Sequence, residues 1–200
     1  MSYHRDEDLR DRINAFLEQA FDLPTEDYYG RLDVRSMLSL KSALSDINNA
    51  VTVRLTLGFL DWAAQTLSFD APAIQQLRGT VLATKPRGNG YDIHCLGPVE
   101  FVAEVKCNIP VNGGRVYGSA QRAGIIKDVD ALLHGKSKGA AVGEKCLKFL
   151  AFLDLPEIRF ANLHLLASSS MASRSFKVLD NNETPDDPKV VYAVYIGFGF

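Results

Sequence analysis

Residues 91–107 read YDIHCLGPVEFVAEVKC, and this stretch decides the fold. Its first part, 91–96, is short and rich in strand-forming residues. Its second part, 99–107, alternates between apolar and polar side chains with a period of two residues. Gly97 and Pro98 provide a tight connection between the two parts. The pattern predicts a β-hairpin.

The second strand of this hairpin has two chemically different faces, because successive side chains of a strand point to opposite sides. One face is apolar and consists of Phe101, Ala103, Val105 and Cys107. The other face carries Glu104 and Lys106, and the neighbouring strand begins near Asp92. If the hairpin aligns these faces, Asp92, Glu104 and Lys106 converge.

Two acids and a lysine in one place suit a particular chemistry. Neighbouring carboxylates raise each other's pKa unless a cation neutralises them. Mg²⁺ is commonly held by one or two carboxylates together with water and phosphate oxygens. A lysine ammonium beside such a metal orients a water molecule or offsets the charge that develops in the transition state. The combination therefore favours hydrolysis of a phosphodiester.

The rest of the chain supplies helices and further strands around the hairpin. Helical spacing or length predicts helices over 9–21, 34–47, 50–67, 72–83 and 119–134. The first half of 50–67 also alternates like a strand, and 156–167 is a short helix or a loop. Apolar runs predict a buried strand within 146–155 and a final strand within 190–200. We expect one α/β domain over 1–200, with an N-terminal helical layer (1–70) and a core (71–200) in which helices flank a mixed sheet.

At Asp92 and at Glu104-Val105-Lys106 the sequence resembles the PD-(D/E)xK nuclease superfamily, the restriction endonuclease-like fold. The resemblance covers about residues 71–155 and implies an αβββαβ-type core. It further implies that Asp92 and Glu104 hold Mg²⁺, or Mn²⁺ in its place, with help from the Val105 carbonyl. Lys106 would position the attacking water, and DNA would be the substrate.

The helix over 119–134 and its surroundings add further candidates. Arg122 falls within the apolar stripe of this helix and Gln121 lies at its edge. The resemblance places a polar residue of this helix beside the site, which makes Gln121 a catalytic candidate. We expect Arg122, Arg115 and Lys127 to bind substrate, because residues 111–148 carry seven basic side chains against three acidic ones. Glu100 is a lesser site candidate.

A second basic group, Lys85 and Arg87, precedes the first strand, and Lys138 belongs to the basic run of 111–148. Basic side chains gathered on one side would form a local surface for nucleic acid. Ordinary mixing of surface charges is the alternative interpretation of both groups.

Three other hypotheses stay open. In the simplest hypothesis, Glu104 and Lys106 form a solvated ion pair on an exposed face. In the second hypothesis, the protein is a noncatalytic binding or assembly protein that keeps the fold and binds a partner through its apolar helical layer. The third is a metal-dependent hydrolase of a small phosphorylated substrate, which requires a deep closed pocket. RNA in place of DNA, and a homodimer, are also left open.

Composition excludes some partners and compartments. The chain has 22 Lys and Arg against 24 Asp and Glu, a net charge of -2, so it is no uniformly basic nucleic-acid binder. No apolar run approaches the roughly 18 residues of a membrane span. The cysteines, Cys95, Cys107 and Cys146, form no CxxC pair and lie in apolar stretches, which favours free thiols in a reducing compartment. We expect a cytoplasmic protein with no membrane partner.

Overall fold

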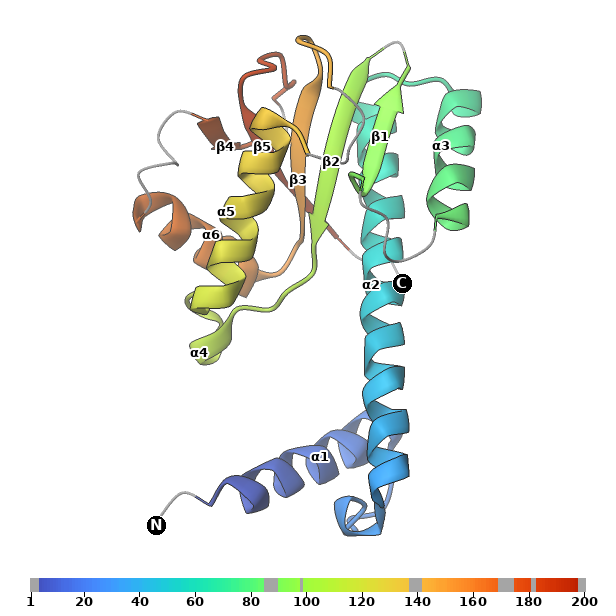
Figure 1. The fold of residues 1–200 in the computed structure, drawn as a ribbon, viewed down its shortest axis with the longest axis vertical. Coiled ribbons are helices and arrows are strands. Elements are labelled where there is room, and N and C mark those ends of the chain that lie inside the picture. The colour runs from blue at the N-terminus through green and yellow to red at the C-terminus, as the bar shows by residue number, and fades with distance from the viewer. Residues whose placement is uncertain are drawn as a thin grey trace. The chain divides into compact units, whose positions relative to one another are not determined.

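The chain forms two compact units, Met1–Ile47 and Asn48–Phe200 (Figure 1). The structure is a computed structural model that describes residues 4–84, 90–97, 99–136, 142–168, 175–180 and 183–197. The predicted N-terminal layer, 1–70, takes in the first unit and the beginning of the second. Helix α2 (Val34–Thr66) crosses the boundary between the units.

The first unit begins with helix α1 (Arg5–Phe21), followed by the short 3₁₀ helix η1 (Tyr29–Arg31). Asn14 of α1 connects them: its side chain donates to Asp27 Oδ1 at 3.0 Å and accepts from the Tyr29 backbone N–H at 2.8 Å. None of the side chains described between residues 4 and 47 is buried. The described residues of this unit therefore contain no buried apolar core.

The helical runs predicted over 34–47 and 50–67 form the single helix α2, because no glycine or proline interrupts the chain between them. Its second half buries an apolar stripe that includes Phe59 and Leu60. Helix α3 (Ala71–Ala83) is capped by Asp70, whose carboxylate accepts a hydrogen bond from the Ala73 N–H at 2.8 Å.

The second unit is built on a five-stranded mixed sheet with the order β1-β2-β3-β5-β4. Its strands are β1 (Ile93–Leu96), β2 (Glu100–Lys106), β3 (Leu147–Leu153), β4 (Phe176–Val178) and β5 (Val191–Ile196). β1 and β2 pair antiparallel as the predicted hairpin, and the other neighbours pair parallel. The prediction of an α/β protein with a mixed sheet flanked by helices is confirmed.

Helices α4 (Val111–Gly114) and α5 (Ser119–His134) lie between β2 and β3 in the chain. Helix α6 (Pro156–Ser168) lies between β3 and β4. α5 and α6 match the predicted helices closely, whereas α4 and β4 were not predicted because elements of three or four residues show no periodicity. The predicted αβββαβ core has three strands before its second helix. Within the described residues two strands, β1 and β2, lie between α3 and α5.

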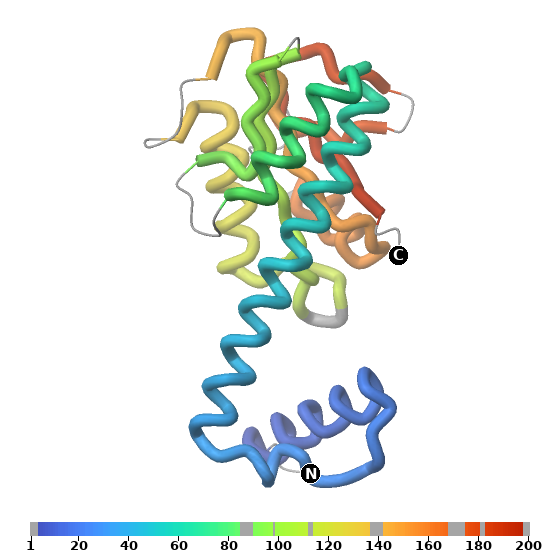
Figure 2. The backbone as a smooth tube through the Cα atoms, turned by 90° about the vertical axis from the view of Figure 1, so that its right-hand side faces the viewer, coloured from blue at the N-terminus to red at the C-terminus, as the bar shows by residue number. Residues whose placement is uncertain are grey.

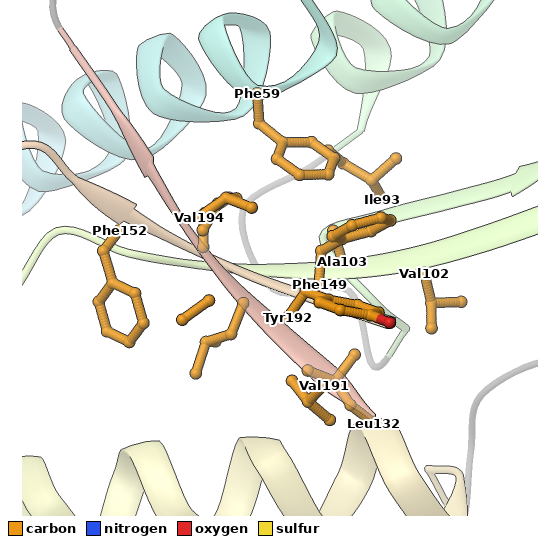
Figure 3. Close-up of a cluster of buried hydrophobic side chains, with 14 of the residues drawn as sticks. Phe59, Ile93, Val102, Ala103, Leu132, Phe149, Phe152, Val191, Tyr192 and Val194 are labelled. Carbon is orange, nitrogen blue, oxygen red and sulfur yellow. The ribbon is translucent and has the colours of Figure 1, made fainter. Parts of the chain in front are cut away.

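Helices cover both faces of the sheet. α2 and α3 lie on one face, and α5 and α6 lie on the other (Figures 1 and 2). On the α2 face, Phe59 packs against Phe101 and Phe149 with ring centroids 5.9 and 5.5 Å apart. On the α5 face, Leu132 lies close to Val191 (Figure 3). The core is therefore continuous through the sheet, and both sides of β2 are covered.

Two further sequence predictions concern cysteines and membranes. Cys95, Cys107 and Cys146 are free thiols, and Cys95 and Cys146 are buried. Among the helices of the described residues, none has both the length and the apolar character needed to cross a membrane.

Candidate functional site

Asp92 and Glu104 lie opposite each other on the β1–β2 pair. Ile93 pairs with Ala103, and continuing this antiparallel register by one residue places Asp92 across from Glu104. The Asp92 carboxylate is fixed to β2 because its Oδ2 accepts a hydrogen bond from the Val105 N–H at 2.9 Å. The structure thus brings the two predicted carboxylates together.

Glu104 is an acid in a largely apolar position. Its side chain projects from β2 toward helix α5 and is 6% exposed. Burial and, after it, the neighbouring Asp92 charge raise the pKa of Glu104 to about 7, although the Lys136 cation opposes the shift. Near neutral pH this carboxyl is therefore poised between its protonated and charged forms.

Lys136, directly after α5, is the cation that partners Glu104. Its Nζ lies 2.5 Å from Glu104 Oε1 and donates to the Gly90 carbonyl at 2.7 Å. The same ammonium lies 5.2 Å from the centroid of the Tyr91 ring, and the Tyr91 hydroxyl donates to the Ala131 carbonyl at 3.1 Å. Lys136 therefore joins Glu104 to the segment that leads into Asp92. In the sequence it had been counted only among the basic residues of 111–148.

Lys106 has a different partner, Asp128 of α5, with which it forms an ion pair. The hypothesis of a solvated Glu104–Lys106 pair is wrong, because Glu104 is buried and pairs with Lys136. Asp128 was also missed. The signal that could have found it is helical phase: Asp128 lies between Ile125 and Leu132 on the face of α5 that meets the sheet, where an acid needs a partner.

Lys106 also lines a pocket of about 230 Å³ at the end of β2. The other lining residues are Asn108, Tyr117, Ala120, Gln121, Gly124 and Ile125. Gln121 is thus near Lys106, as predicted for a catalytic candidate, but both ends of its amide bind backbone. Its Oε1 accepts from the Gly118 N–H at 3.1 Å and its Nε2 donates to the Ile109 carbonyl at 2.8 Å. This contact caps the start of α5.

Glu100 lies at the other end of β2. Its Oε1 accepts from the Gly143 N–H at 3.0 Å and thereby holds the segment that precedes β3. Four residues of strand, or about 13 Å, separate it from Glu104. Glu100 is therefore better placed to anchor a loop than to join Asp92 and Glu104.

The three predicted substrate-binding residues lie on α5 or in the turn before it. Arg115 is exposed in the turn after α4, Lys127 is exposed on α5, and Arg122 is half-buried near the start of α5. Of the other basic residues predicted to face nucleic acid, Lys85, Arg87 and Lys138 lie outside the described residues.

The donor atoms suit a hard divalent cation in kind and number. Within the described residues no group of three or more His, Cys, Asp or Glu side chains is placed to hold a metal. Mg²⁺, however, commonly uses only one or two carboxylates and keeps several waters. Asp92 Oδ1 and Glu104 Oε2 accept no hydrogen bond from the described part of the chain. A cation between them would offset the repulsion that raises the pKa of Glu104.

Comparisons with protein-family models, curated proteins and solved structures give no significant match to this chain. The chemistry of the site has to be inferred from its own side chains.

Proposed function

We propose that this protein is a metal-dependent nuclease that hydrolyses DNA phosphodiester bonds and has a restriction endonuclease-like core. The observation that carries the proposal is the meeting of Asp92 and Glu104 on the β1–β2 pair, where burial and mutual repulsion raise the pKa of Glu104. Structural acids are seldom kept in such a position, since a buried charge costs free energy unless it is compensated.

Asp92 and Glu104, together with the Val105 carbonyl, would hold Mg²⁺ or Mn²⁺. The bound metal would polarise the phosphodiester and lower the pKa of a water molecule. Lys106 projects from the same face of β2 two residues after Glu104, and its ammonium would orient the attacking water. Asp128 would direct this ammonium along the sheet, because the two side chains form an ion pair.

The order of elements supports the same proposal. A hairpin that carries the two acids is followed by a helix and by a strand parallel to β2, namely α5 and β3. This arrangement leaves one end of β2 next to the start of α5. Arg122 near that start, with Arg115 and Lys127 exposed in the turn after α4 and on α5, would bind the DNA backbone, so binding should weaken steeply with salt.

The direct test is cleavage of supercoiled, linear, single-stranded and branched DNA, and of RNA, with Mg²⁺, Mn²⁺ or a chelator. We expect metal-dependent cleavage of DNA, and a loss of about 100-fold or more in the variants Glu104→Gln and Lys106→Ala. Glu183→Gln and Lys177→Ala are matched controls, because they remove the same groups from an exposed ion pair. Equal activity in all four variants would contradict the assigned roles.

One observation favours a second function, that of a noncatalytic protein with the same fold. Both charged residues that follow Asp92 on this face already have partners in the chain, since Glu104 pairs with Lys136 and Lys106 with Asp128. Under this alternative the pairs are structural, calorimetry detects no Mn²⁺ binding, and Asp92→Asn leaves every property unchanged. The hydrolase of a small substrate has less support, because the pocket beside Lys106, about 230 Å³, is smaller than most ligand sites.

A further inference from the structure

Lys136 lies in a cage of oxygen atoms and aromatic surface beside the two carboxylates. Its ammonium contacts Glu104 Oε1 at 2.5 Å and the Gly90 carbonyl at 2.7 Å, and the centroid of the Tyr91 ring lies 5.2 Å away. Carboxylate and carbonyl oxygens are also ligands of hard divalent cations, and the face of an aromatic ring attracts positive charge. The ammonium therefore occupies a position that suits a second metal ion next to the first.

The preceding residue, Gly135, turns the chain so that Lys136 reaches this cage. Helix α5 ends at His134, and the Gly135 N–H donates to the Ala131 carbonyl at 2.9 Å. Gly135 has φ 89° and ψ 157°, a backbone conformation that is essentially restricted to glycine. No atom of the described chain lies within 4 Å of the point where a Cβ would be. The glycine is thus needed for its conformation and not for space.

A metal ion and Lys136 can use different oxygen atoms of Glu104. Lys136 binds Oε1, while Asp92 Oδ2 accepts from the Val105 N–H. Glu104 Oε2 and Asp92 Oδ1 accept no hydrogen bond from the described part of the chain, so they are left for a metal. The ammonium and one metal ion can therefore share the site without one displacing the other.

The charges of the site favour one metal ion over two. Asp92 and Glu104 carry two negative charges, which one divalent cation cancels. Lys106 and Asp128 cancel each other as an ion pair. Lys136 then leaves a single positive charge, which matches the single negative charge of one phosphodiester. A second divalent cation would raise this excess to three positive charges.

We propose that Lys136 takes the place of a second metal ion, so that the site binds one divalent cation. In sites with two metal ions, the ions lie about 3.5–4 Å apart and share the charge of the reacting phosphate. Here Lys136 supplies the second positive charge as a positioning residue, which acts through Glu104 by holding its Oε1. The inference rests on the proposed metal-dependent function, but the number of bound ions is measured without any reaction.

The test is titration of the full chain with Mn²⁺ in isothermal calorimetry, with the electron paramagnetic resonance spectrum of the bound ion as a second readout. We expect one ion per chain in the wild type, with the spectrum of an isolated Mn²⁺. Lys136→Glu exchanges the ammonium for a carboxylate, so it should bind two ions with the spin-coupled spectrum of ions about 3.5–4 Å apart. Lys136→Gln should keep one ion and bind it at least about 10-fold more tightly, because a repelling charge is removed.

Gly135→Ala leaves Lys136 in the chain but strains the turn that directs it, so its affinity for Mn²⁺ should also rise. Lys177→Glu and Lys177→Gln are the matched controls, because Lys177 pairs with Glu183 at an exposed position, and both should bind Mn²⁺ as the wild type does. Circular dichroism shows whether each variant is folded.

Two ions in the wild type, or equal affinities in the wild type and Lys136→Gln, would overturn the role of Lys136 alone. An absence of Mn²⁺ binding in every variant would overturn the metal-dependent function as well. One ion per chain without cleavage of DNA would support the role of Lys136 and contradict only the nuclease activity.

Discussion

The two faces of strand β2 are both buried, yet they hold opposite kinds of chemistry. Toward α2, Phe101 and Ala103 join a cluster of aromatic rings around Phe59. Toward α5, Glu104 and Lys106 lie under the helix and are neutralised by Lys136 and Asp128. One face can be explained entirely by packing, and the other cannot.

The difference shows which face contributes most to the stability of the fold. Apolar burial stabilises a fold in proportion to its area, by about 25 cal/mol per Å². A buried ion pair often adds nothing over apolar residues of the same volume, because desolvation offsets the attraction. The charged face is therefore the one that points to function, and three sets of variants test the contrast.

The largest effect is expected on the aromatic face. Phe149 of β3 is fully buried there, and its ring contacts those of Phe59, Trp62, Phe101 and Tyr192. Phe149→Ala should lower the free energy of unfolding by about 3–5 kcal/mol in urea denaturation. Phe160→Ala is the control: Phe160 is 55% exposed, and its truncation should cost less than about 1 kcal/mol. Similar losses at both positions would refute the assignment of the main core to this face.

The charged face should instead respond to pH. The pKa of Glu104 is about 7 in the folded protein against an ordinary value of 4.5, so the folded state holds this proton more tightly than the unfolded state. The contribution of Glu104 to the free energy of unfolding is therefore greatest below pH 4.5. It falls by roughly 3 kcal/mol as the pH rises to 7.

Urea denaturation at several pH values measures this dependence. Glu104→Gln should remove the decline between pH 4.5 and 7, because the amide does not titrate. Lys136→Gln should enlarge the decline and extend it above pH 7, since the Lys136 cation lowers the pKa of Glu104. If the pH profile of Glu104→Gln is the same as that of the wild type, Glu104 is not the buried titrating acid.

The smallest effect concerns the contact between the hairpin and α5. The Tyr91 hydroxyl donates to the Ala131 carbonyl, so Tyr91→Phe removes one hydrogen bond while the ring stays in place. We expect a loss of about 1 kcal/mol in the free energy of unfolding. If Tyr91 also positions the Asp92 segment, the same variant weakens Mn²⁺ binding in calorimetry. An unchanged affinity would limit Tyr91 to a structural role.

Local patterns were sufficient for most of the second unit. The period of two in 99–107 predicted β2, and the hairpin register then brought Asp92 next to Glu104. A glutamine at the third position of a helix can cap that helix, and Gln121 here binds Gly118 and Ile109, while its catalytic role stays a prediction. Helical phase gave no means of choosing between these two roles.

The sequence by itself determined that Glu104 and Lys106 share a face of one strand, because that depends only on the alternation of side chains along a strand. Only the tertiary structure decided that this face is buried and that its charges pair with Lys136 and Asp128. Those partners lie 32 and 22 residues further along the chain. An ion pair depends on distance in space, and here that distance is set by how α5 packs on the sheet.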